Sequence, residues 1–472
     1  MNTYFRTNGK RLQAKYNQAL EGLKKNVRLL PGYSKPVLQE GGMYEGIWLE
    51  CGPQEGMLWG EYQPEIAKNN HEIFFDLIDP EGYLPALVND RPRCGHLQTV
   101  VPIARTALET IDKFGFEELL PKAYEACAQY DIYLTTFRNS RGTDLVESHC
   151  PWDTGHARSP RHAGQGDHCP DFDTKRHLDL PQLPVLAPDL SANKYSGRLA
   201  LAEMAYRLGK KSEADQWLEK ADSLREAIWR YTFDEQDRMF YDLDNEGHFI
   251  RVKSDAFLRV LQEKVPTQQE FDELFEAHVM NPKEFWTPYP FPSIAADDPT
   301  FDWEYETNHW AGPGQALLAL RTPLWLEPYG KWIPQRYLME KWIEAILENE
   351  SFQQQMNPFS GEFNTTEQYS PCMLVLTDFI ARLYGIKYFE GSILWGTHLA
   401  RGGDWHEYQT IICGRKYHLS NHNGCTILSL NDRELMRVFG EARIETDLDG
   451  NLLAVHRTGC GRVIVEKAVE HH

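Results

Sequence analysis

The stretch LSANKYSGRLALAEMAYRLGKKSEADQWLEKADSLREAIWRYTFD, residues 190–234, predicts the fold class of this chain. Apolar side chains recur at helical spacing in both of its halves. Gly209 stands between the halves, where a helix-ending glycine belongs, and Ser212 with Asp215 resembles a capping box that opens the second helix. The stretch therefore predicts two amphipathic helices that pack as a hairpin.

The same pattern is repeated along most of the chain. Residues 97–137 predict a second hairpin that breaks at Phe114 and Gly115. Eleven or twelve helices with alternating short and long connections are what an (α/α)6 toroid of six helical hairpins needs. Further helices are expected at residues 8–25, 62–78, 254–262, 267–279, 308–321, 331–349 and 369–385.

The pattern changes after residue 385. Several segments alternate or run apolar, as strands do, and Asp449-Gly450 is a typical hairpin turn. We therefore expect a mainly α protein with a toroid domain at residues 1–385 and a small β-rich C-terminal domain at residues 386–470.

Composition narrows the classes of partner. The chain has 472 residues and a formal charge of −20, which disfavours binding to nucleic acid and to anionic membranes. Nine scattered cysteines do not form a disulfide pattern. The N-terminus lacks the apolar stretch of a signal peptide, and no run of about 18 apolar residues occurs. We expect a cytoplasmic protein without a cofactor; its oligomeric state is left open.

Long connections rich in aromatic and charged residues are the expected site of chemistry. They lie at residues 36–62, 147–189, 284–314 and 349–371, and each combines Trp, Tyr or Phe with carboxylates, Gly and Pro. Aromatic faces stack on the C–H surfaces of sugars, and carboxylates and amides bind their hydroxyls. This composition favours a carbohydrate ligand, with a predicted platform of Trp48, Trp59, Trp152, Trp286, Tyr289 and Trp310.

An ordered set of motifs resembles one family. The motifs are PWDTGHARSPR, LAPDLSANKYSGRLALAEMAYRLG, FYDLDNEGHF, PFPSIAADDP, NHWAGPG and NPFSGE. In this order they are similar to six-hairpin glycoside hydrolases, in particular the group of processing α-glucosidase I, mannosylglycerate hydrolase and, more distantly, trehalase. The resemblance spans about residues 40–385 and implies an α-linked oligosaccharide or glycoside as substrate.

The resemblance implies roles for individual residues. Asp153 matches the general acid that protonates the glycosidic oxygen, and Trp152 beside it is expected to raise the pKa of Asp153. Arg158 or Arg161 matches an arginine that holds the substrate or the acid. Three more residues match a segment that helps to form the sugar pocket: Asp189, Asn193 and Tyr195.

Two departures from the family pattern bear on activity. Trp310 is followed by Ala311, where relatives carry an arginine, which leaves the bound sugar open. Gln354 occupies the best match to the general base, and an amide lacks the basicity to accept a proton from water. Either the base has moved, to Glu362 or less favourably to Glu367, or the chain is an inactive or altered relative.

The favoured function is hydrolysis with inversion. It needs one protonated carboxyl group and a second carboxylate about 6.5–9.5 Å away, so that a water molecule fits between the carboxylate and the sugar. Asp153 and Glu362 are the predicted acid and base.

Other interpretations remain open. A lyase or an epimerase on the same toroid would use His156, His309 or Tyr369 as proton carriers, and a non-catalytic sugar-binding protein would tolerate Gln354. A calcium loop at Asp167, Asp171 and Asp173 lacks the EF-hand pattern. A zinc site is disfavoured because the spacing matches no familiar set; its ligands would come from His149, Cys150, His156, His162, His168, Cys169 and His177.

Overall fold

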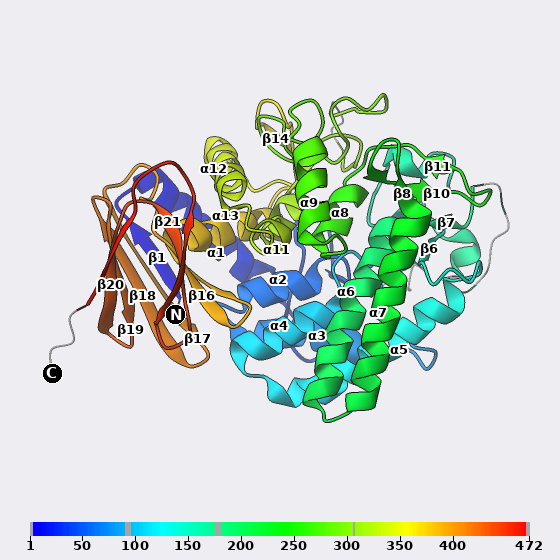
Figure 1. The fold of residues 1–472 in the computed structure, drawn as a ribbon, viewed down its shortest axis with the longest axis horizontal. Coiled ribbons are helices and arrows are strands. Elements are labelled where there is room, and N and C mark those ends of the chain that lie inside the picture. The colour runs from blue at the N-terminus through cyan, green and yellow to red at the C-terminus, as the bar shows by residue number, and fades with distance from the viewer. Residues whose placement is uncertain are drawn as a thin grey trace.

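The computed structural model describes residues 3–89, 96–173, 175, 180, 182–304 and 307–468. A helical part holds most of the chain, and a strand-rich part lies beside it with both chain ends on its side (Figure 1). The helices are α1 (Lys10–Asn26), α2 (Gly52–Trp59), α3 (Pro64–Asp76), α4 (Ile103–Phe114), α5 (Leu120–Phe137), α6 (Pro188–Arg207), α7 (Lys211–Thr232), α8 (Ala256–Gln262), α9 (Gln268–Leu274), α10 (Ala316–Arg321), α11 (Pro323–Leu326), α12 (Trp332–Glu348) and α13 (Ser370–Tyr384).

Alternate helices contact one another around the helical part. α2 contacts α4, α4 contacts α6, and α6 contacts α8. On the other side α10 contacts α13, which contacts α2, and α11 contacts both α8 and α10. The chain is thus mainly helical, as predicted, and this order of contacts returns to its starting point.

The hairpin predicted from residues 190–234 is confirmed as α6 and α7, which pack along each other. Gly209 between them has a φ of 77°, the left-handed conformation that glycine adopts without steric cost. The predicted capping box is wrong. α7 already begins at Lys211, with Lys210 at the N-cap and no side-chain cap, so Ser212 lies within the first turn.

Two antiparallel sheets make up the strand-rich part. The larger has the order β1 (Tyr4–Thr7), β17 (Trp405–Ile412), β18 (Arg415–His422), β19 (Cys425–Leu430), β20 (Arg433–Phe439) and β23 (Ile464–Lys467). The smaller has the order β15 (Ile386–Phe389), β16 (Ser392–Gly396), β21 (Ala442–Thr446) and β22 (Leu452–Arg457). Trp395 of the smaller sheet meets Tyr417 of the larger edge to face, with ring centroids 5.7 Å apart.

The predicted β-rich character after residue 385 is confirmed, including the turn at Gly450 between β21 and β22. Alternate residues of β17 are buried, as expected for a strand with one face on a core. Strand β1 pairs with β17 over Tyr4–Thr7. The N-terminal strand therefore belongs to the C-terminal sheet, a pairing that a division at residue 385 does not contain.

Short strands within the long connections pair with one another and form small sheets. They form the sheets β4 (Ile47–Trp48) with β5 (Leu87–Val88); β12 (Gly314–Gln315), β13 (Gln355–Met356) and β14 (Phe363–Asn364); and β11 (Phe249–Ile250), β10 (Asp242–Leu243), β7 (Val185–Leu186) and β6 (Glu147–Ser148). Two more strand pairs are β2 (Val27–Arg28) with β3 (Val37–Leu38) and β8 (Phe233–Asp234) with β9 (Met239–Phe240). Two of these pairings, β12 with β13 and β7 with β10, hold segments that are far apart in sequence side by side.

Two helical expectations differ from the structure. The helix predicted at 308–321 begins at Ala316, because residues 314–315 pair as β12. Helix α2 lies within a connection that was not expected to be helical; its eight residues are all buried.

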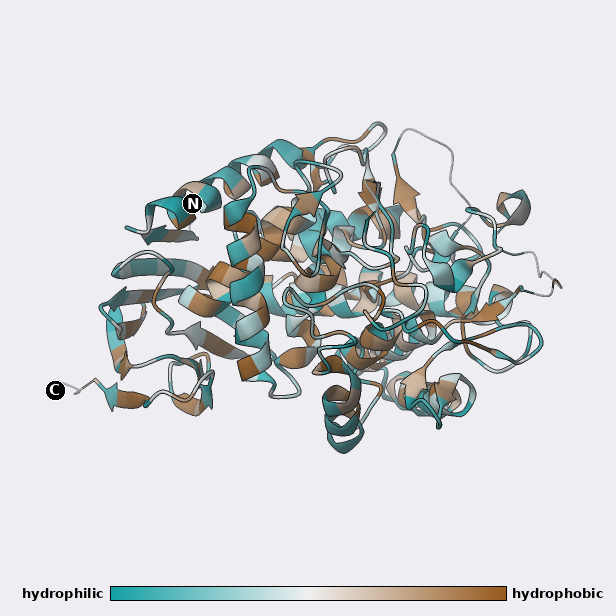
Figure 2. Cartoon of the chain, turned by 90° about the horizontal axis from the view of Figure 1, so that it is seen from above, coloured by the Kyte–Doolittle hydropathy of each residue, from teal (hydrophilic) through white to brown (hydrophobic). Residues whose placement is uncertain are grey.

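Hydrophilic and hydrophobic residues share the same helices and strands (Figure 2). No helix in the described part of the chain is long and apolar enough to cross a membrane. The cysteines of the described residues are free thiols, and Cys94 lies outside them.

Candidate active site

A narrow cavity, called here the tryptophan cavity, gathers side chains from five separate connections and from α10. Trp48 belongs to β4, Trp152 to the 3-10 turn Pro151–Asp153, and Gln354 directly precedes β13. The short strands therefore bring these connections to one place. The lining residues are Glu40, Tyr44, Trp48, Glu50, Gln98, Trp152, Gly155, Asn308, Trp310, Leu317 and Gln354.

Aromatic rings line the cavity. Trp48 and Trp152 stack with ring centroids 6.4 Å apart and planes 18° from parallel. Tyr44 meets Trp48 edge-on at 6.3 Å. Trp310 packs edge-on against His156, with ring centroids 5.0 Å apart. The guanidinium of Arg259 lies 5.1 Å from the centroid of the Trp310 ring. These faces offer the apolar surface that suits the C–H side of a sugar ring.

Amides bring hydrogen-bonding groups into the same space. Gln354 Oε1 accepts a 2.7 Å hydrogen bond from the Tyr44 hydroxyl, and Gln98 Nε2 donates to Glu50 Oε2 at 3.0 Å. Buried polar atoms without a hydrogen-bond partner suit a bound molecule. Within the described residues, the lining side chains hold three: Trp48 Nε1, Glu50 Oε1 and Asn308 Oδ1.

Glu40 is a buried carboxyl group of the cavity wall. Its Oε1 accepts a 2.6 Å hydrogen bond from the Tyr369 hydroxyl, and its backbone carbonyl accepts one from the amide of Ser370, the first residue of α13. Burial raises the pKa of Glu40 well above its usual range, and the charges of Glu55 and Glu50 raise it further. The carboxyl group of Glu40 therefore holds a proton more readily than the carboxyl group of an exposed glutamate does.

Glu50 and Glu55 flank the start of α2. Burial is the largest cause that raises the pKa of Glu55 to about 7; the Cys51 thiol lowers the pKa, and Glu50 raises it. Arg321 Nη2 lies 3.7 Å from Glu50 Oε1. Three buried carboxyl groups thus share one nearby guanidinium.

Gly155 makes room for the Glu50 carboxyl group. A Cβ at this position would lie 2.8 Å from Glu50 Oε1 and Oε2, and the backbone φ is 69°. A side chain here would meet the carboxylate and strain the backbone. The sequence folds so that the Trp152 turn passes directly over Glu50.

Asp153 has a different environment from the one predicted. Its carboxylate is fully buried and pairs with Arg138, with Nη1 2.8 Å from Oδ2. The backbone amides of Leu97 and His149 each donate to it at 2.7 Å. Burial raises the pKa of Asp153, but Arg138 and His149 outweigh burial and lower the pKa to about 2. The expected increase is therefore wrong, because the partner charge overrides Trp152.

The second predicted arginine also belongs to a buried network. Arg161 Nη1 donates to Asp189 Oδ2 at 2.9 Å, and its Nε donates to Asp242 Oδ2 at 2.7 Å. Arg161 and Arg259 lower the pKa of Asp189 below its usual range despite burial. Arg158 is exposed, with a φ of 56°, and donates to the Thr307 hydroxyl.

Several other predicted residues do not line the tryptophan cavity. Trp59 is fully buried, stacks on Tyr62 at 4.9 Å and packs in the core. Asn193 and Tyr195 are buried in α6. Trp286 packs against Tyr337, and the Tyr289 hydroxyl donates to Glu344 Oε1 at 3.1 Å. Glu362 and Glu367 are exposed, and Glu362 lies at the end of the turn from Asn357. Of the predicted site residues, Trp48, Trp152, Trp310 and Gln354 meet at the cavity.

The histidines and cysteines around residues 149–169 have other partners. His156 Nε2 lies 2.8 Å from Asp255 Oδ1, and burial lowers the pKa of His156 to about 4. His162 bonds Thr154. His177 lies outside the described residues. Within the described ranges no group of three or more His, Cys, Asp or Glu side chains is placed to hold a metal ion.

His309 and Tyr369, predicted as proton carriers in a lyase or an epimerase, have different surroundings. His309 is buried, and its ring nitrogens lie 3.0 Å from the Thr307 carbonyl and 3.1 Å from that of Asp302. Tyr369 reaches the tryptophan cavity through its bond to Glu40.

Sequence reasoning missed Glu40, Tyr44, Glu50, Gln98 and Asn308. The signal for three of them was present, because the connection at residues 36–62 was singled out for combining aromatic residues with carboxylates. That composition identifies the connection but does not distinguish Glu40 and Glu50 from its other glutamates. Asn308 begins the motif NHWAGPG, so a signal for it was present as well, whereas no local pattern marks Gln98.

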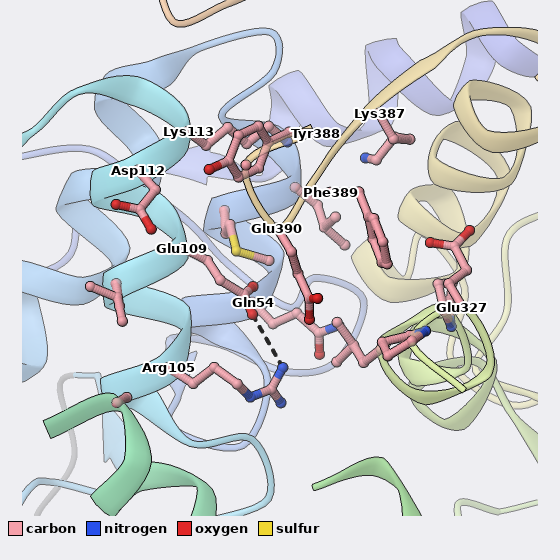
Figure 3. A pocket seen from close by; sticks show the side chains of 18 of the residues that line it. Gln54, Arg105, Glu109, Asp112, Lys113, Glu327, Lys387, Tyr388, Phe389 and Glu390 are labelled. Atoms are coloured by element: carbon pink, nitrogen blue, oxygen red, sulfur yellow. Dashed lines mark hydrogen bonds and ion pairs between the residues drawn. The ribbon is translucent and has the colours of Figure 1, made fainter. Parts of the chain in front are cut away.

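A larger cavity, about 740 Å³, lies between the helical part and the strand-rich part. Figure 3 shows Arg105, Glu109, Asp112 and Lys113 of α4 on one side and residues 387–390 on the other. Its charged groups are largely paired: Lys387 bonds Asp378 at 2.7 Å, and Arg105 bonds Glu263 at 3.1 Å. Paired charges make it the less suitable place for acid–base chemistry.

Comparison with solved structures supports the fold. Mannosylglycerate hydrolase from Thermus thermophilus, in complex with glucose, has a TM-score of 0.62 at 18% identity, covering 78% of this chain and 100% of that one. A protein named sialidase has a TM-score of 0.70 at 13% identity, covering 94% and 41%. Neutral trehalase from Saccharomyces cerevisiae has a TM-score of 0.55 at 12% identity, covering 73% of each chain.

The search of curated proteins found no match. The profile of the mannosylglycerate hydrolase MGH1-like glycoside hydrolase domain matches residues 56–370, more than half of the chain. That range includes Trp152, Trp310 and Gln354 of the cavity, whereas Glu40 and Glu50 precede it. With a helical fold shared with glycosidases and a cavity of aromatic rings and carboxyl groups, this chain belongs to the MGH1-like glycoside hydrolase family and is a glycosidase.

Proposed function

We propose that the chain hydrolyses an α-linked glycoside or short oligosaccharide in the tryptophan cavity, with inversion at the anomeric carbon. The observation that carries this proposal is the meeting of three tryptophans, two carboxyl groups and three amides in one cavity. The rings suit the sugar faces, and the unpartnered polar atoms suit its hydroxyls.

We also propose that the helical part is a toroid of six helical hairpins. The contact order α2, α4, α6, α8, α11, α10, α13 and back to α2 supports an inner ring of helices, with α11 between α8 and α10. The long connections then gather at one end of the ring, where the cavity lies. A cytoplasmic location remains a prediction from the sequence.

A small substrate is favoured. The cavity is narrow, about 20 Å³, and is lined by Trp48, Trp152 and Trp310, which favours a small ligand. The structural relative that is named a mannosylglycerate hydrolase makes α-mannosyl and α-glucosyl glycerates suitable first substrates, beside α-linked disaccharides.

One observation favours a second candidate function, sugar binding without hydrolysis. Gln354 lies in the cavity, where its amide accepts a bond from Tyr44 and has no basic oxygen to activate water. A protein that keeps the aromatic walls but lacks a base would bind sugar and leave it intact.

Product analysis separates the two functions. The chain is incubated with a panel of α-glycosides. Proton NMR then follows the anomeric signals of the sugar that is released first. Appearance of the β-anomer first supports inverting hydrolysis; the α-anomer first contradicts inversion. Quenching of tryptophan fluorescence by a sugar, without any product, would instead support the binding protein.

A further inference from the structure

We infer that the larger cavity, between the helical part and the strand-rich part, is a second binding site whose ligand is a small neutral carbohydrate. This site is separate from the tryptophan cavity, and it does not depend on the function proposed for that cavity. Four features of the larger cavity carry the assignment: its position, its unpartnered polar atoms, its paired charges and its aromatic rings.

The two cavities lie at opposite ends of the same helices. Glu50 just before α2 and Leu317 near the start of α10 line the tryptophan cavity. Leu58 and Leu320, near the ends of those two helices, line the larger cavity. The last turns of three more helices also line it, with Asp112 of α4, Arg207 of α6 and Gln262 of α8. A ligand in the larger cavity is therefore distinct from a ligand in the tryptophan cavity.

The larger cavity has the size and the position of a ligand pocket. Its volume of about 740 Å³ lies within the range of about 300–1,000 Å³ that is usual for pockets that bind small molecules. Figure 3 shows Arg105 and Glu109 extending from α4, and Phe389 and Glu390 extending from the strand-rich part. Such junctions between two parts of a protein are a preferred place for ligands.

Four side chains of the wall each hold a buried polar atom without a hydrogen-bond partner among the described residues. These atoms are Gln54 Oε1, Glu263 Oε2, Glu327 Oε1 and Arg105 Nε. Glu327 Oε1 lies 3.6 Å from Arg443 Nη2, so the charge of Glu327 is matched although this oxygen accepts no hydrogen bond. Since buried polar atoms in proteins are nearly always hydrogen-bonded, four in one wall indicate groups that a bound molecule satisfies.

Bonds at their other atoms hold two of these side chains in place. Glu263 Oε1 accepts hydrogen bonds from Arg105 Nη2 at 3.1 Å and from Gln262 Nε2 at 2.7 Å. Gln54 Nε2 donates to the carbonyl of Leu320 at 3.5 Å. Gln54 is 1% exposed and Glu263 is 3% exposed, so neither can turn to solvent for a partner. Groups that are fixed before binding lose little conformational entropy when a ligand arrives.

The charges of the wall favour a neutral ligand. The lining residues include six acidic and six basic side chains. Lys264 Nζ lies 2.5 Å from Glu390 Oε1, and Arg207 pairs with Asp112. An anion or a cation would have to compete with these pairs, whereas a neutral molecule leaves them intact.

The remaining groups of the wall match a sugar. Three of the unpartnered atoms accept hydrogen bonds and one donates, and a sugar hydroxyl can serve both kinds. The helices that end at the cavity carry partial negative charge there, which favours the hydrogen of a hydroxyl group. Tyr388 and Phe389 are half-buried and line the cavity, so their rings can pack on the C–H surface of a sugar.

Ligand-observed NMR in the Trp152→Ala background tests the site. This background removes a wall of the tryptophan cavity, and the probes are glucose, mannose and maltose, whose integrity the same spectra report. We expect Trp152→Ala to keep sugar binding, and the further change Leu199→Trp to lower the affinity at least about tenfold by filling the larger cavity. Leu218→Trp, at an exposed position of α7, is the matched control and should leave the affinity unchanged.

A second variant tests the unpartnered amide without filling the cavity. Gln54→Met keeps the length of the side chain and removes its polar atoms. The variant should unfold at the same temperature as its parent or higher, because an unsatisfied buried group is lost, and its sugar affinity should fall about tenfold. If Leu199→Trp does not fold, Gln54→Met still decides the role of the wall.

Three outcomes would overturn the inference. Loss of all sugar binding in Trp152→Ala would assign every bound sugar to the tryptophan cavity. Unchanged affinity in the folded Gln54→Met variant would remove the role of the unpartnered atoms. Binding of spermidine or inorganic phosphate, and of none of the sugars, would make the ligand charged. Because binding is measured here and not turnover, a chain that hydrolyses no glycoside can pass this test, and an active one can fail it.

Discussion

Two groups of buried carboxylates lie in the helical part, and they differ in their counter-charges. The first group, the arginine-paired carboxylates, comprises Asp153, Asp189 and Asp255, which pair with Arg138, Arg161 and Arg259. The second group, the cavity carboxylates, comprises Glu40, Glu50 and Glu55, which share Arg321. Pairing lowers the pKa values of the first group, and burial without enough positive charge raises those of Glu40 and Glu55.

The difference teaches which carboxylates hold the fold and which are free for chemistry. Asp153 joins the amide of Leu97 to the turn of Trp152, so it positions two segments that line the cavity without entering it. A carboxylate held by a guanidinium and two amides has no proton to give at neutral pH. The four predictions that follow test this contrast.

The largest effect is expected from breaking an arginine pair. Arg161→Met leaves Asp189 and Asp242 buried without their shared guanidinium, and we expect a loss of about 3–5 kcal/mol in the free energy of unfolding, measured by urea denaturation. Arg415→Met removes an exposed pair with Asp449 and should change the free energy of unfolding far less. Similar losses of unfolding free energy in both variants would contradict the difference between buried and exposed ion pairs.

Asp153→Asn tests whether Asp153 only stabilises the fold or also transfers a proton during catalysis. It leaves Arg138 buried without a carboxylate, so we expect a loss of about 3 kcal/mol in unfolding free energy. Because Asp153 does not reach the cavity, the remaining folded enzyme should show equal losses of kcat on activated and unactivated glycosides. A loss confined to unactivated glycosides would make Asp153 the acid after all.

Glu55→Gln should stabilise the protein at alkaline pH. Below pH 4.5 the folded and unfolded states are both protonated; between pH 4.5 and about 7 only the folded state keeps the proton, so stability falls with rising pH and levels off above 7. Gln mimics the protonated form, so at pH 8 we expect a gain of up to about 3 kcal/mol at about 1.4 kcal/mol per pH unit.

Thermal unfolding at pH 4 and pH 8 measures this effect. The gain should disappear at pH 4, where wild type and variant are both uncharged at this position. Glu348→Gln, at an exposed site, should not show the same dependence on pH. A Glu55 variant that is destabilised at pH 8 would show that its charge is compensated.

The smallest effect is expected from Gln354→Glu. It adds a fourth carboxyl group near Glu40 and Glu50, at a position already bonded by Tyr44, and we expect a loss of about 1 kcal/mol at pH 8 and less than a twofold change in kcat. Gln354→Ala, which removes the bond to Tyr44, is the control for packing. A large gain of activity in Gln354→Glu would place the general base at residue 354.

The local signals of the sequence predicted the elements well. Gly209 and Gly115 end helices where apolar periodicity stops, and alternation after residue 385 marks strands with one buried face. The aromatic connections also pointed to Trp48, Trp152 and Trp310, and the family resemblance pointed to Gln354; all four line the cavity. These features depend on neighbours within a few residues, so the sequence carries them.

The roles of the carboxylates could not be predicted from the sequence in this way. Asp153 directly follows Trp152, and Glu50 lies two residues after Trp48. Yet Asp153 meets Arg138, 15 residues earlier, and Glu50 lies by Arg321, 271 residues away. Strand β1 likewise finds its partner β17 about 400 residues later. Sequence spacing gives no measure of such distances.

The sequence by itself determined a helical glycosidase with a β-rich C-terminal part and an aromatic site for a sugar. Only the tertiary structure decided which carboxyl groups reach that site and which are held by arginines. The physical reason is that the charge of a buried carboxyl group depends on the few ångströms around it, and folding fills that space with residues from distant parts of the chain.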